Sequence, residues 1–431
     1  MGYYHIDMLS LEKRNELVAF VTEHTKSNFY RGLYGLQDSS DTFSVSSEGE
    51  WRNLPTFTKD DLIPIQMSEM SFLPLKEIDH VRASSGTSGK PPLFSPRTEV
   101  RGVDYRLKYH DFKNPILSFG VPLMPHWHEE LQRNQGSRAT TVTFDPQNPE
   151  ICAHLASVIG VDAISFFVHH MKIAGEALKK YNHTSEIRFI ELAGGICSRG
   201  LYEYIRETFR NAVIVPFYGS SETEDVPIGV PCHPMDGSDP LSVYHPKDTH
   251  YLELIHPETG EWVEPVPGAE GDLLITSYPG WPCAVPLIRF RIGDRVSILD
   301  SKCSHTDFAF TVLGRTDLDI LKIQGGVIRA DEIARVLRLF SDLVTDDFEL
   351  HSYEKKSGHL IDTNIEIHVD PKRIPFDFNQ FARSLESSIR VGPEKSYADG
   401  VSVGTYRSIS CKKIGPNDGT KKRKRIVLHT I

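Results

Sequence analysis

The sequence predicts an α/β fold with a large N-terminal domain and a small α+β C-terminal domain. Helix and strand patterns alternate between residues 149 and 217, as they do where helices cover a parallel sheet. Residues 251–312 change to strand-like runs separated by glycine and proline turns, which predicts a β-rich subdomain. Beyond residue 314 enough chain remains for one small domain. We therefore divide the chain into domains 1–314 and 315–431.

The elements of the α/β part follow from local patterns. Residues 11–26 carry apolar side chains at helical spacing and predict a weakly amphipathic helix. Across 149–180 the pattern predicts a helix, a strand and a second helix, and 187–192 predicts another strand. Ser198 is suited to cap the next helix, because a serine oxygen accepts hydrogen bonds from free backbone N–H groups. Ala212 opens the strand that follows.

The second half of the chain predicts more strands. Residues 286–294 alternate apolar and polar side chains, which predicts a strand that ends at Gly293-Asp294. Beyond residue 314 the patterns predict helices over 330–340 and 379–389 and strands over 364–369 and 425–429. These elements would form the small α+β domain.

Composition and charge predict a cytoplasmic protein that works in water. The 431 residues are 39% hydrophobic and 25% charged, which is ordinary for globular proteins. The first residues lack the cationic and apolar regions of a signal peptide, and no apolar run has membrane-spanning length. A net charge of −10 argues against nucleic acid as a partner. The six cysteines form no C-x-x-C pair, so we expect neither a disulfide framework nor a structural zinc.

The segment Ser84-Ser85-Gly86-Thr87-Ser88-Gly89-Lys90 has the composition of a phosphate-binding loop. Its glycines permit backbone conformations in which N–H groups converge, its hydroxyls add donors and its lysine adds a positive charge. The kinase-type phosphate loop is excluded, because Pro91 and Pro92 oppose the helix that this loop requires. The chemistry suits a nucleoside triphosphate, and a solvated linker is the alternative.

Three further polar clusters end or follow strand-like segments. Tyr218-Gly219-Ser220-Ser221-Glu222 follows 212–217 and offers an aromatic face, hydroxyls and a carboxylate suited to Mg²⁺. Asp294 offers a carboxylate that can accept hydrogen bonds from both ribose hydroxyls. Gly314-Arg315-Thr316-Asp317 is the last cluster. Each alone is compatible with a surface turn or hairpin, but the four in this order predict one nucleotide site.

The four segments resemble those of the adenylate-forming ligases, the superfamily of acyl-CoA synthetases, peptide-synthetase adenylation domains and luciferases. SSGTSGKP, YGSSE, PLIRFRIGD and GRTDLD occur in that order at similar spacings, most closely as in the phenylacetate-CoA ligase branch. The resemblance covers almost the whole chain. It implies a large adenylate-forming domain and a small mobile one. It also implies ATP-dependent activation of a carboxylic acid to an acyl-adenylate, with release of pyrophosphate, and transfer to a thiol.

The resemblance implies ATP, Mg²⁺ and coenzyme A as the cofactors, and it assigns residue roles by motif position. Ser221 would contact the α-phosphate, Glu222 would hold Mg²⁺, and Asp317 would be the hinge of the small domain. Tyr218 would stack on adenine and Asp294 would bind ribose. The candidates for cofactor binding are Ser84, Ser85, Gly86, Thr87, Ser88, Gly89, Lys90, Gly194, Gly195, Tyr218, Gly219, Ser220, Asp294 and Arg315.

The catalytic lysine implied by the resemblance falls in the basic tail. Lys422 has Arg425 three residues later, as in the family, although Lys421 stands where the family has glycine. We assign the role to Lys422. Lys421 and Lys424 are the alternatives, together with a solvated basic strand or a nuclear-localisation-like patch.

The acyl pocket departs from the family pattern. His126-Trp127-His128 and His169 stand where close relatives have other residues, and Ala193 precedes the glycines of the adenine side. Imidazoles beside the pocket favour a polar, hydroxylated or anionic carboxylate, so we expect an aryl or small polar acid. Structural histidines, or a metal pair at His126 and His128, are the alternatives.

Other functions remain open at the level of sequence. The acyl group can pass to a carrier-protein thiol or an amine, the reaction can stop at AMP transfer, or the chain can be a non-catalytic ATP-binding protein. The expected partner is a small carboxylate, with a carrier protein and a second copy of the chain as further candidates.

Overall fold

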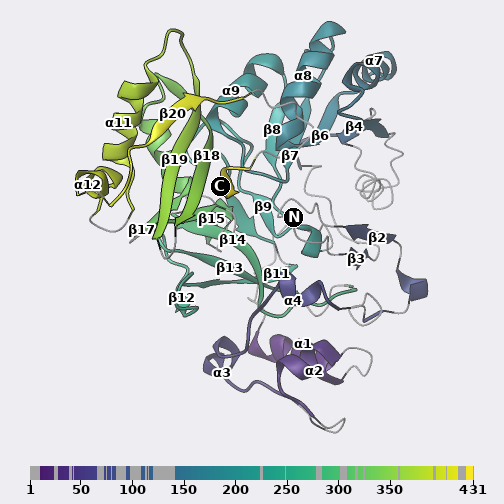
Figure 1. The fold of residues 1–431 in the computed structure, drawn as a ribbon. Coiled ribbons are helices and arrows are strands. Elements are labelled where there is room, and N and C mark those ends of the chain that lie inside the picture. Colours follow the sequence, from purple (N-terminus) through teal and green to yellow (C-terminus); the bar gives the residue numbers. More distant parts are fainter. Residues whose placement is uncertain are drawn as a thin grey trace. The chain divides into compact units, whose positions relative to one another are not determined.

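The computed structural model describes residues 10–23, 28–37, 41, 43–65, 72–73, 75–78, 80–83, 94–97, 108–111, 114, 116–119, 141–223, 227–247, 249–277, 284–300, 308–315, 319–323, 326–357, 360–391, 395–403, 405–415 and 424–430. The chain divides into two compact units, and Figure 1 labels their helices and strands. The first unit comprises Met1–Gly195 and Thr208–Val312. The second unit comprises Ile196–Glu207 and Leu313–Ile431. No sequence pattern sets residues 196–207 apart from their neighbours.

The first unit begins with short helices: α1 (Leu11–Glu23), α2 (Asn28–Leu33), α3 (Glu48–Arg52), α4 (Lys59–Leu62) and the 3₁₀ helix η1 (Leu75–Glu77). The α1 helix confirms the one expected over 11–26, of which residues 24–26 lie outside the described residues. Two of these helices begin with a serine or threonine cap. The Ser47 oxygen accepts from the Glu50 N–H, and Thr58 forms a capping box with Asp61.

A five-stranded parallel sheet forms the α/β part, in the order β5-β4-β6-β7-β8. Its strands are β4 (Ile116–Phe119), β5 (Thr141–Phe144), β6 (Ala163–Phe167), β7 (Phe189–Ala193) and β8 (Val213–Pro216). The intervening helices are α7 (Pro149–Ile159), η3 (Val168–His170), α8 (Met171–Lys180) and α9 (Arg199–Thr208). The helix, strand and helix expected over 149–180 are confirmed. Ser198 also caps α9 as expected, since its Oγ accepts from the Leu201 N–H over 3.2 Å.

An eight-stranded sheet forms the β-rich part, in the order β12-β11-β13-β14-β15-β10-β9, with β1 (Phe57–Thr58) beside β14. The other strands are β9 (Gly229–Pro231), β10 (Tyr244–Pro246), β11 (His250–Ile255), β12 (Trp262–Val263), β13 (Glu270–Ser277), β14 (Phe290–Leu299) and β15 (Ala309–Arg315). The β-rich texture expected over 251–312 is confirmed. The rings of Phe57 and Phe290 lie 5.3 Å apart in the core between the N-terminal helices and this sheet.

One strand boundary predicted from the sequence is wrong. The strand expected over 286–294 begins only at Phe290 and continues to Leu299, so Gly293-Asp294 lies inside it. Before Phe290 the chain is not extended, because Arg289 has a φ of +52°. After Asp294 the alternation of buried and half-buried residues continues through Val296 and Ile298, and β13 pairs along this stretch.

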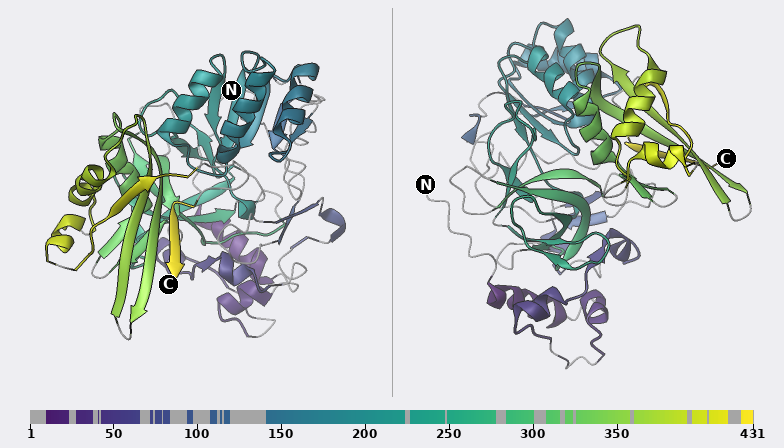
Figure 2. Two further views of the ribbon diagram at one scale, coloured as in Figure 1. Left: turned by 45° about the horizontal axis from the view of Figure 1, so that its top comes forward. Right: turned by 90° about the vertical axis from the view of Figure 1, so that its left-hand side faces the viewer.

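The second unit contains a β-hairpin of β16 (Ile320–Ile323) and β17 (Gly326–Arg329) and a four-stranded sheet in the order β20-β19-β18-β21. The sheet strands are β18 (Val344–Ser357), β19 (Leu360–Pro371), β20 (Ser410–Lys413) and β21 (Ile426–Thr430), and β18 and β19 are the long green pair in Figure 2. The helices are α10 (Ala330–Leu339), α11 (Phe378–Ser388) and α12 (Tyr397–Ser402). All four elements predicted here are confirmed.

Two strands of the first unit frame the predicted phosphate loop. β2 (His80–Ala83) and β3 (Phe94–Arg97) pair antiparallel, and Ala83 is the partner of Phe94. The connection that contains residues 84–90 therefore starts and ends at one end of this hairpin. The loop itself lies outside the described residues. Among the residues that are described, no helix is long and apolar enough to cross a membrane.

Candidate nucleotide-binding site

Tyr218 and Asp294 meet at the centre of the candidate site. The Tyr218 hydroxyl donates a hydrogen bond to Asp294 Oδ2 over 2.8 Å, although the residues are 76 positions apart. Tyr218 lies two residues after β8, and Asp294 lies within β14. Both side chains are buried, with 7% and 9% of their surface exposed. The structure thus brings together two of the predicted site residues, one from the connection after β8 and one from β14.

The orientation of Tyr218 is set by aromatic packing. The centre of its ring lies 5.5 Å from that of Tyr244, in a tilted arrangement. It lies 5.7 Å from that of Phe310, in an edge-to-face arrangement. A buried tyrosine needs a partner for its hydroxyl, and Asp294 is that partner here. The packing therefore positions the carboxylate of Asp294 as well as the tyrosine ring. Stacking of Tyr218 on adenine stays a prediction.

Each oxygen of the Glu222 carboxylate has a polar neighbour. It lies in the short 3₁₀ helix η4 (Ser221–Thr223), where Ser220 Oγ donates to Glu222 Oε2 over 2.6 Å. The Lys59 ammonium lies 3.6 Å from Glu222 Oε1, and both side chains are partly buried. A carboxylate that holds an ammonium at this position can hold another cation there. Sequence reasoning missed the proximity of Lys59 to Glu222, because nothing in the local pattern of Lys59 pairs it with residue 222.

The carboxyl ends of the parallel strands supply the glycines of the site. Gly194 follows β7 with a φ of +68°, and a Cβ there would come within 2.3 Å of Phe167 Cδ1 at the end of β6. Only glycine fits this close approach without displacement of the ring. Gly194 and Gly195 are exposed, whereas Ala193 is buried. Ligands of open α/β sheets bind outside this edge of the strands, which supports these glycines as candidates for contact with a base.

His169 and its neighbour His170 follow β6 in η3. The side chain of His169 lies outside the described part of the structure. His170 is buried beside Phe166 and Phe167, and burial lowers its pKa from 6.5 to about 4. At neutral pH His170 is therefore an uncharged core residue, which is one of the alternatives that the sequence left open for these histidines.

Several predicted site residues lie outside the described residues. They are Ser84, Ser85, Gly86, Thr87, Ser88, Gly89, Lys90, His126, Trp127, His128, Asp317 and Lys422. Of the two alternatives to Lys422, Lys421 also lies outside the described residues, and Lys424 is exposed two residues before β21. Arg315 ends β15, and its N–H donates to Asp319 Oδ2 over 2.7 Å. Arg315 and Asp294 belong to different units, and the roles of all these residues stay predictions.

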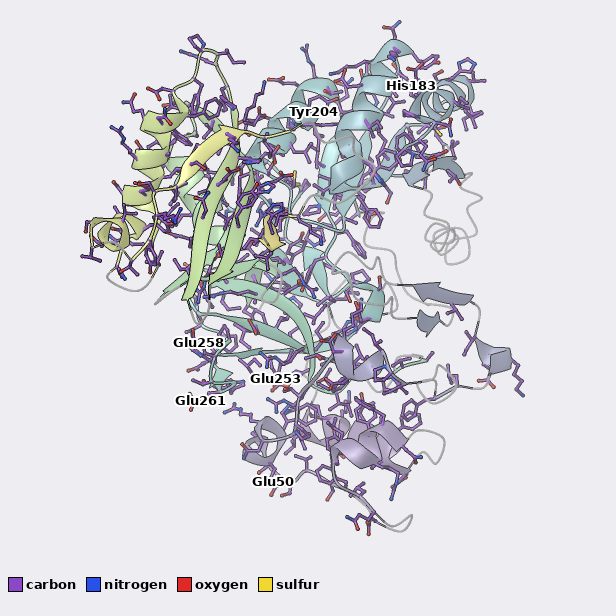
Figure 3. All side chains as sticks on the ribbon, in the orientation of Figure 1. Glu50, His183, Tyr204, Glu253, Glu258 and Glu261 are labelled. Carbon is purple, nitrogen blue, oxygen red and sulfur yellow. The ribbon has the colours of Figure 1, made fainter. Side chains whose placement is uncertain are left out.

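A buried ion pair supports the strand that carries Asp294. Arg289 Nε lies 3.4 Å from Glu253 Oε2, and the Trp51 indole donates to the same oxygen over 3.0 Å (Figure 3 labels Glu253). The pKa of Glu253 lies above its ordinary value because the carboxyl group is buried, and the positive charge of Arg289 offsets part of this rise. Arg289 also donates to the carbonyl of Arg52 over 2.7 Å. The arginine before β14 thus joins the sheet to the N-terminal helices, a structural role that sequence reasoning missed.

A cavity of about 410 Å³ lies in the N-terminal helical region of the same unit. Tyr34, Phe43, Leu54 and Glu50 are among its lining residues (Figure 3 labels Glu50). It shares no residue with the candidate site and contains no phosphate-binding motif. We therefore do not assign the nucleotide to it.

Comparisons with known proteins agree with this fold. No family model and no curated protein sequence matches the chain. A solved structure of 2-hydroxyisobutyryl-CoA ligase with 2-HIB-AMP matches 97% of this chain and 88% of its own, with 15% identity and a TM-score of 0.69. The acyl acid amido synthetase GH3.15 matches 97% of this chain and 92% of its own, with 15% identity and a TM-score of 0.63.

A more distant match is O-succinylbenzoate coenzyme A synthetase from Bacillus subtilis, in complex with AMP. It covers 93% of this chain and 81% of its own, with 17% identity and a TM-score of 0.50. The chain therefore has the fold of the adenylate-forming enzymes. The α/β fold class read from the sequence is confirmed, and the fold is the one that the superfamily resemblance implies.

Proposed function

We propose that this protein is an AMP-forming carboxylate-CoA ligase. It activates a carboxylic acid with ATP to an acyl-adenylate, releases pyrophosphate, and transfers the acyl group to the thiol of coenzyme A. The observation that carries the proposal is the hydrogen bond between Tyr218 and Asp294, two motif residues that lie 76 positions apart in the chain. The resemblance gives these two residues to adenine and ribose, and they meet beside the edge where α/β sheets bind ligands.

The chemistry needs positioned charges more than a covalent nucleophile. A carboxylate oxygen attacks the α-phosphorus of ATP and the bond to pyrophosphate breaks, so negative charge must be stabilised on phosphate oxygens. We assign Ser221 to the α-phosphate, residues 84–90 to the β- and γ-phosphates, and Lys422 to the transferring group. Asp294 fixes the ribose through charge-assisted hydrogen bonds.

The residues present fit a magnesium ion bound with the nucleotide. Mg²⁺ typically takes one or two protein carboxylates and completes its shell with phosphate oxygens and water. Glu222 supplies such a carboxylate, and the nearby Lys59 ammonium marks it as a position that holds positive charge. When bound, Mg²⁺ neutralises charge on the phosphate oxygens.

The second half-reaction needs an acceptor. Displacement of AMP by the coenzyme A thiolate breaks the acyl–oxygen bond and leaves that oxygen on AMP. We propose that the small domain moves about Asp317 between the two half-reactions. An amine is the second candidate acceptor, because the structure of an acyl acid amido synthetase matches 97% of this chain. For the acid we propose a small polar or aryl carboxylate, because the residues expected at its pocket include His126, His128 and His169.

The test is a turnover assay with the full-length protein. ATP, Mg²⁺ and a panel of aryl and hydroxylated carboxylates are supplied, with coenzyme A, with amino acids, or with neither. We expect AMP and pyrophosphate in equal amounts only when a carboxylate is present, and a thioester when coenzyme A is added. Formation of ADP, or tight ATP binding without turnover on any acid, would contradict the proposal. The second outcome would favour a non-catalytic ATP-binding protein.

A further inference from the structure

The outer face of the sheet in the second unit carries a group of histidines and glutamates. Alternate residues of a strand share one face. Phe348 and Leu350 of β18 lie with Ile365, Ile367 and Val369 of β19 in the core that also includes residues of α10 and α11. The opposite face therefore holds Glu349, His351, Glu366, His368 and, from β21, His429. We call these five residues the histidine cluster. They belong to the second unit, whereas Tyr218, Glu222 and Asp294 belong to the first.

The sheet register explains why the cluster is compact. Glu349 is the direct cross-strand partner of His368, and His351 is the partner of Glu366. His351 and His368 are diagonal neighbours, and their rings stack with centroids 4.1 Å apart. Directly opposite side chains are the closest pairs of a sheet. The register thus places two imidazoles around one carboxylate.

Three possible metal-ligand atoms of the cluster, one each from Glu349, His351 and His368, lie close together. Glu349 Oε2 lies 3.1 Å from His351 Nε2 and 4.0 Å from His368 Nδ1. One ligand atom from each residue lies within 4.8 Å of the other two. In a tetrahedral zinc site, with bonds of about 2.0–2.2 Å, the ligand atoms stand about 3.4 Å apart. The distances of 3.1 Å and 4.0 Å from Glu349 Oε2 to the two histidine nitrogens lie on either side of this ligand separation. Small side-chain rotations would therefore bring the three atoms to the spacing of zinc ligands.

The second nitrogen of each histidine already has a partner. His368 Nε2 lies 3.2 Å from Glu366 Oε2, and Lys412 donates to the other oxygen of Glu366 over 2.8 Å. His351 Nδ1 lies 2.9 Å from His429 Nε2. Histidines that bind metals are usually oriented in this way, by a polar partner at the nitrogen that does not face the ion.

We propose that Glu349, His351 and His368 bind a divalent transition-metal ion such as Zn²⁺. Two imidazoles and one carboxylate suit zinc, whereas Mg²⁺ and Ca²⁺ prefer oxygen ligands alone. The three side chains are 13–22% exposed, which leaves a fourth position open to water. The ion would join β18 to β19. This site does not depend on the proposed ligase activity. The cysteine spacing that argued against zinc does not bear on it, because histidines on paired strands have no fixed spacing.

The experiment measures zinc affinity on the full-length protein. Metal-stripped protein competes with a chromogenic chelator for Zn²⁺, without nucleotide. We expect one tightly bound Zn²⁺ per chain and a loss of affinity of at least about 100-fold in Glu349→Gln and in His368→Asn. Glu366→Gln, which only orients His368, should lose about 10- to 100-fold. The control is His154→Asn, on the exposed surface of α7, which should bind as the wild type does.

The outcomes separate a metal site from a hydrogen-bonded cluster. Circular dichroism checks the fold of each variant, and Glu349→Gln is the decisive one because it keeps the side-chain size. Equal zinc affinity in the wild type, Glu349→Gln and His368→Asn would overturn the proposal. Histidine ring-nitrogen NMR of the wild type needs no variant. Addition of one equivalent of Zn²⁺ should shift two histidines strongly, and unshifted spectra would also overturn it.

Discussion

The hydroxyl of Tyr218 donates to the carboxylate of Asp294 over 2.8 Å and links the loop after β8 to the centre of β14. This bond adds to a backbone bridge between Tyr218 and Gly229, the first residue of β9. Aromatic packing fixes Tyr218, and the buried Arg289–Glu253 pair fixes the start of β14. A carboxylate held this firmly loses little freedom when it accepts hydrogen bonds from a ligand.

The first prediction concerns Asp294. Asp294→Asn should lower ATP affinity about 10- to 100-fold, because hydrogen bonds to a charged group contribute about 1.5–3 kcal/mol. Tyr218→Phe should lower it less, since only the orienting bond is lost. Isothermal titration calorimetry measures both. The control is Glu270→Gln, which removes an exposed carboxylate of the same sheet that pairs with Arg295. Wild-type affinity in Asp294→Asn would refute the ribose role.

The second prediction concerns Glu222. Glu222→Gln should raise the Mg²⁺ concentration needed for half-maximal pyrophosphate release by about tenfold or more, because the amide keeps the shape and loses the charge. Saturating Mg²⁺ should restore part of the rate. Glu261→Gln, in the exposed turn between β11 and β12, is the control (Figure 3). An unchanged Mg²⁺ dependence in Glu222→Gln would assign the metal to another residue.

The third prediction concerns Gly194. Both Gly194→Ala and Gly160→Ala place a side chain at a positive φ, which costs about 1–2 kcal/mol. At Gly160 nothing lies within 4 Å of the new Cβ, whereas at Gly194 the Phe167 ring must also move. Urea unfolding should therefore show a larger loss of stability for Gly194→Ala. Equal losses in the two variants would mean that the Phe167 contact is unimportant.

The fourth prediction concerns His170 and pH. Burial lowers its pKa in the folded state from 6.5 to about 4, so between these values the unfolded chain binds the proton and the folded chain does not. The stability that neutral His170 contributes is complete above about pH 6.5 and is lost as pH falls toward 4. His170→Phe should flatten the decline of unfolding free energy across this window, whereas His154→Phe should not. A slope unchanged by His170→Phe would contradict the assignment.

Local patterns in the sequence were enough to predict the elements around the site. The apolar periodicity that places α7, β6 and α8, and the hydroxyl of Ser198 that caps α9, are encoded within a few residues. The prediction that the strand ends at Asp294 was wrong because a Gly-Asp pair is typical of a turn. The strand continues to Leu299 because the alternation of buried and half-buried residues continues beyond Asp294.

Contacts between distant segments could not be predicted in this way. Lys59 lies beside Glu222, and Trp51 donates to Glu253, because the N-terminal helices pack against these distant residues. No local sequence pattern predicts this packing. The histidine cluster depends on the pairing of Glu349 with His368, and a shift of one residue in register would move these two side chains to opposite faces. The hydrogen bond between Tyr218 and Asp294 was not predicted, because the order of the motifs and the resemblance only assigned both residues to one nucleotide site.

Oxygen-isotope transfer tests the central claim most directly. A turnover substrate is labelled with ¹⁸O in its carboxylate and incubated with the protein, ATP, Mg²⁺ and coenzyme A, and the products are analysed by mass spectrometry. If the acid attacks the α-phosphorus, one labelled oxygen per turnover must appear in AMP when the thiol displaces it, and none in pyrophosphate. Label in inorganic phosphate or pyrophosphate, or unlabelled AMP formed alongside the thioester, would contradict the adenylate mechanism.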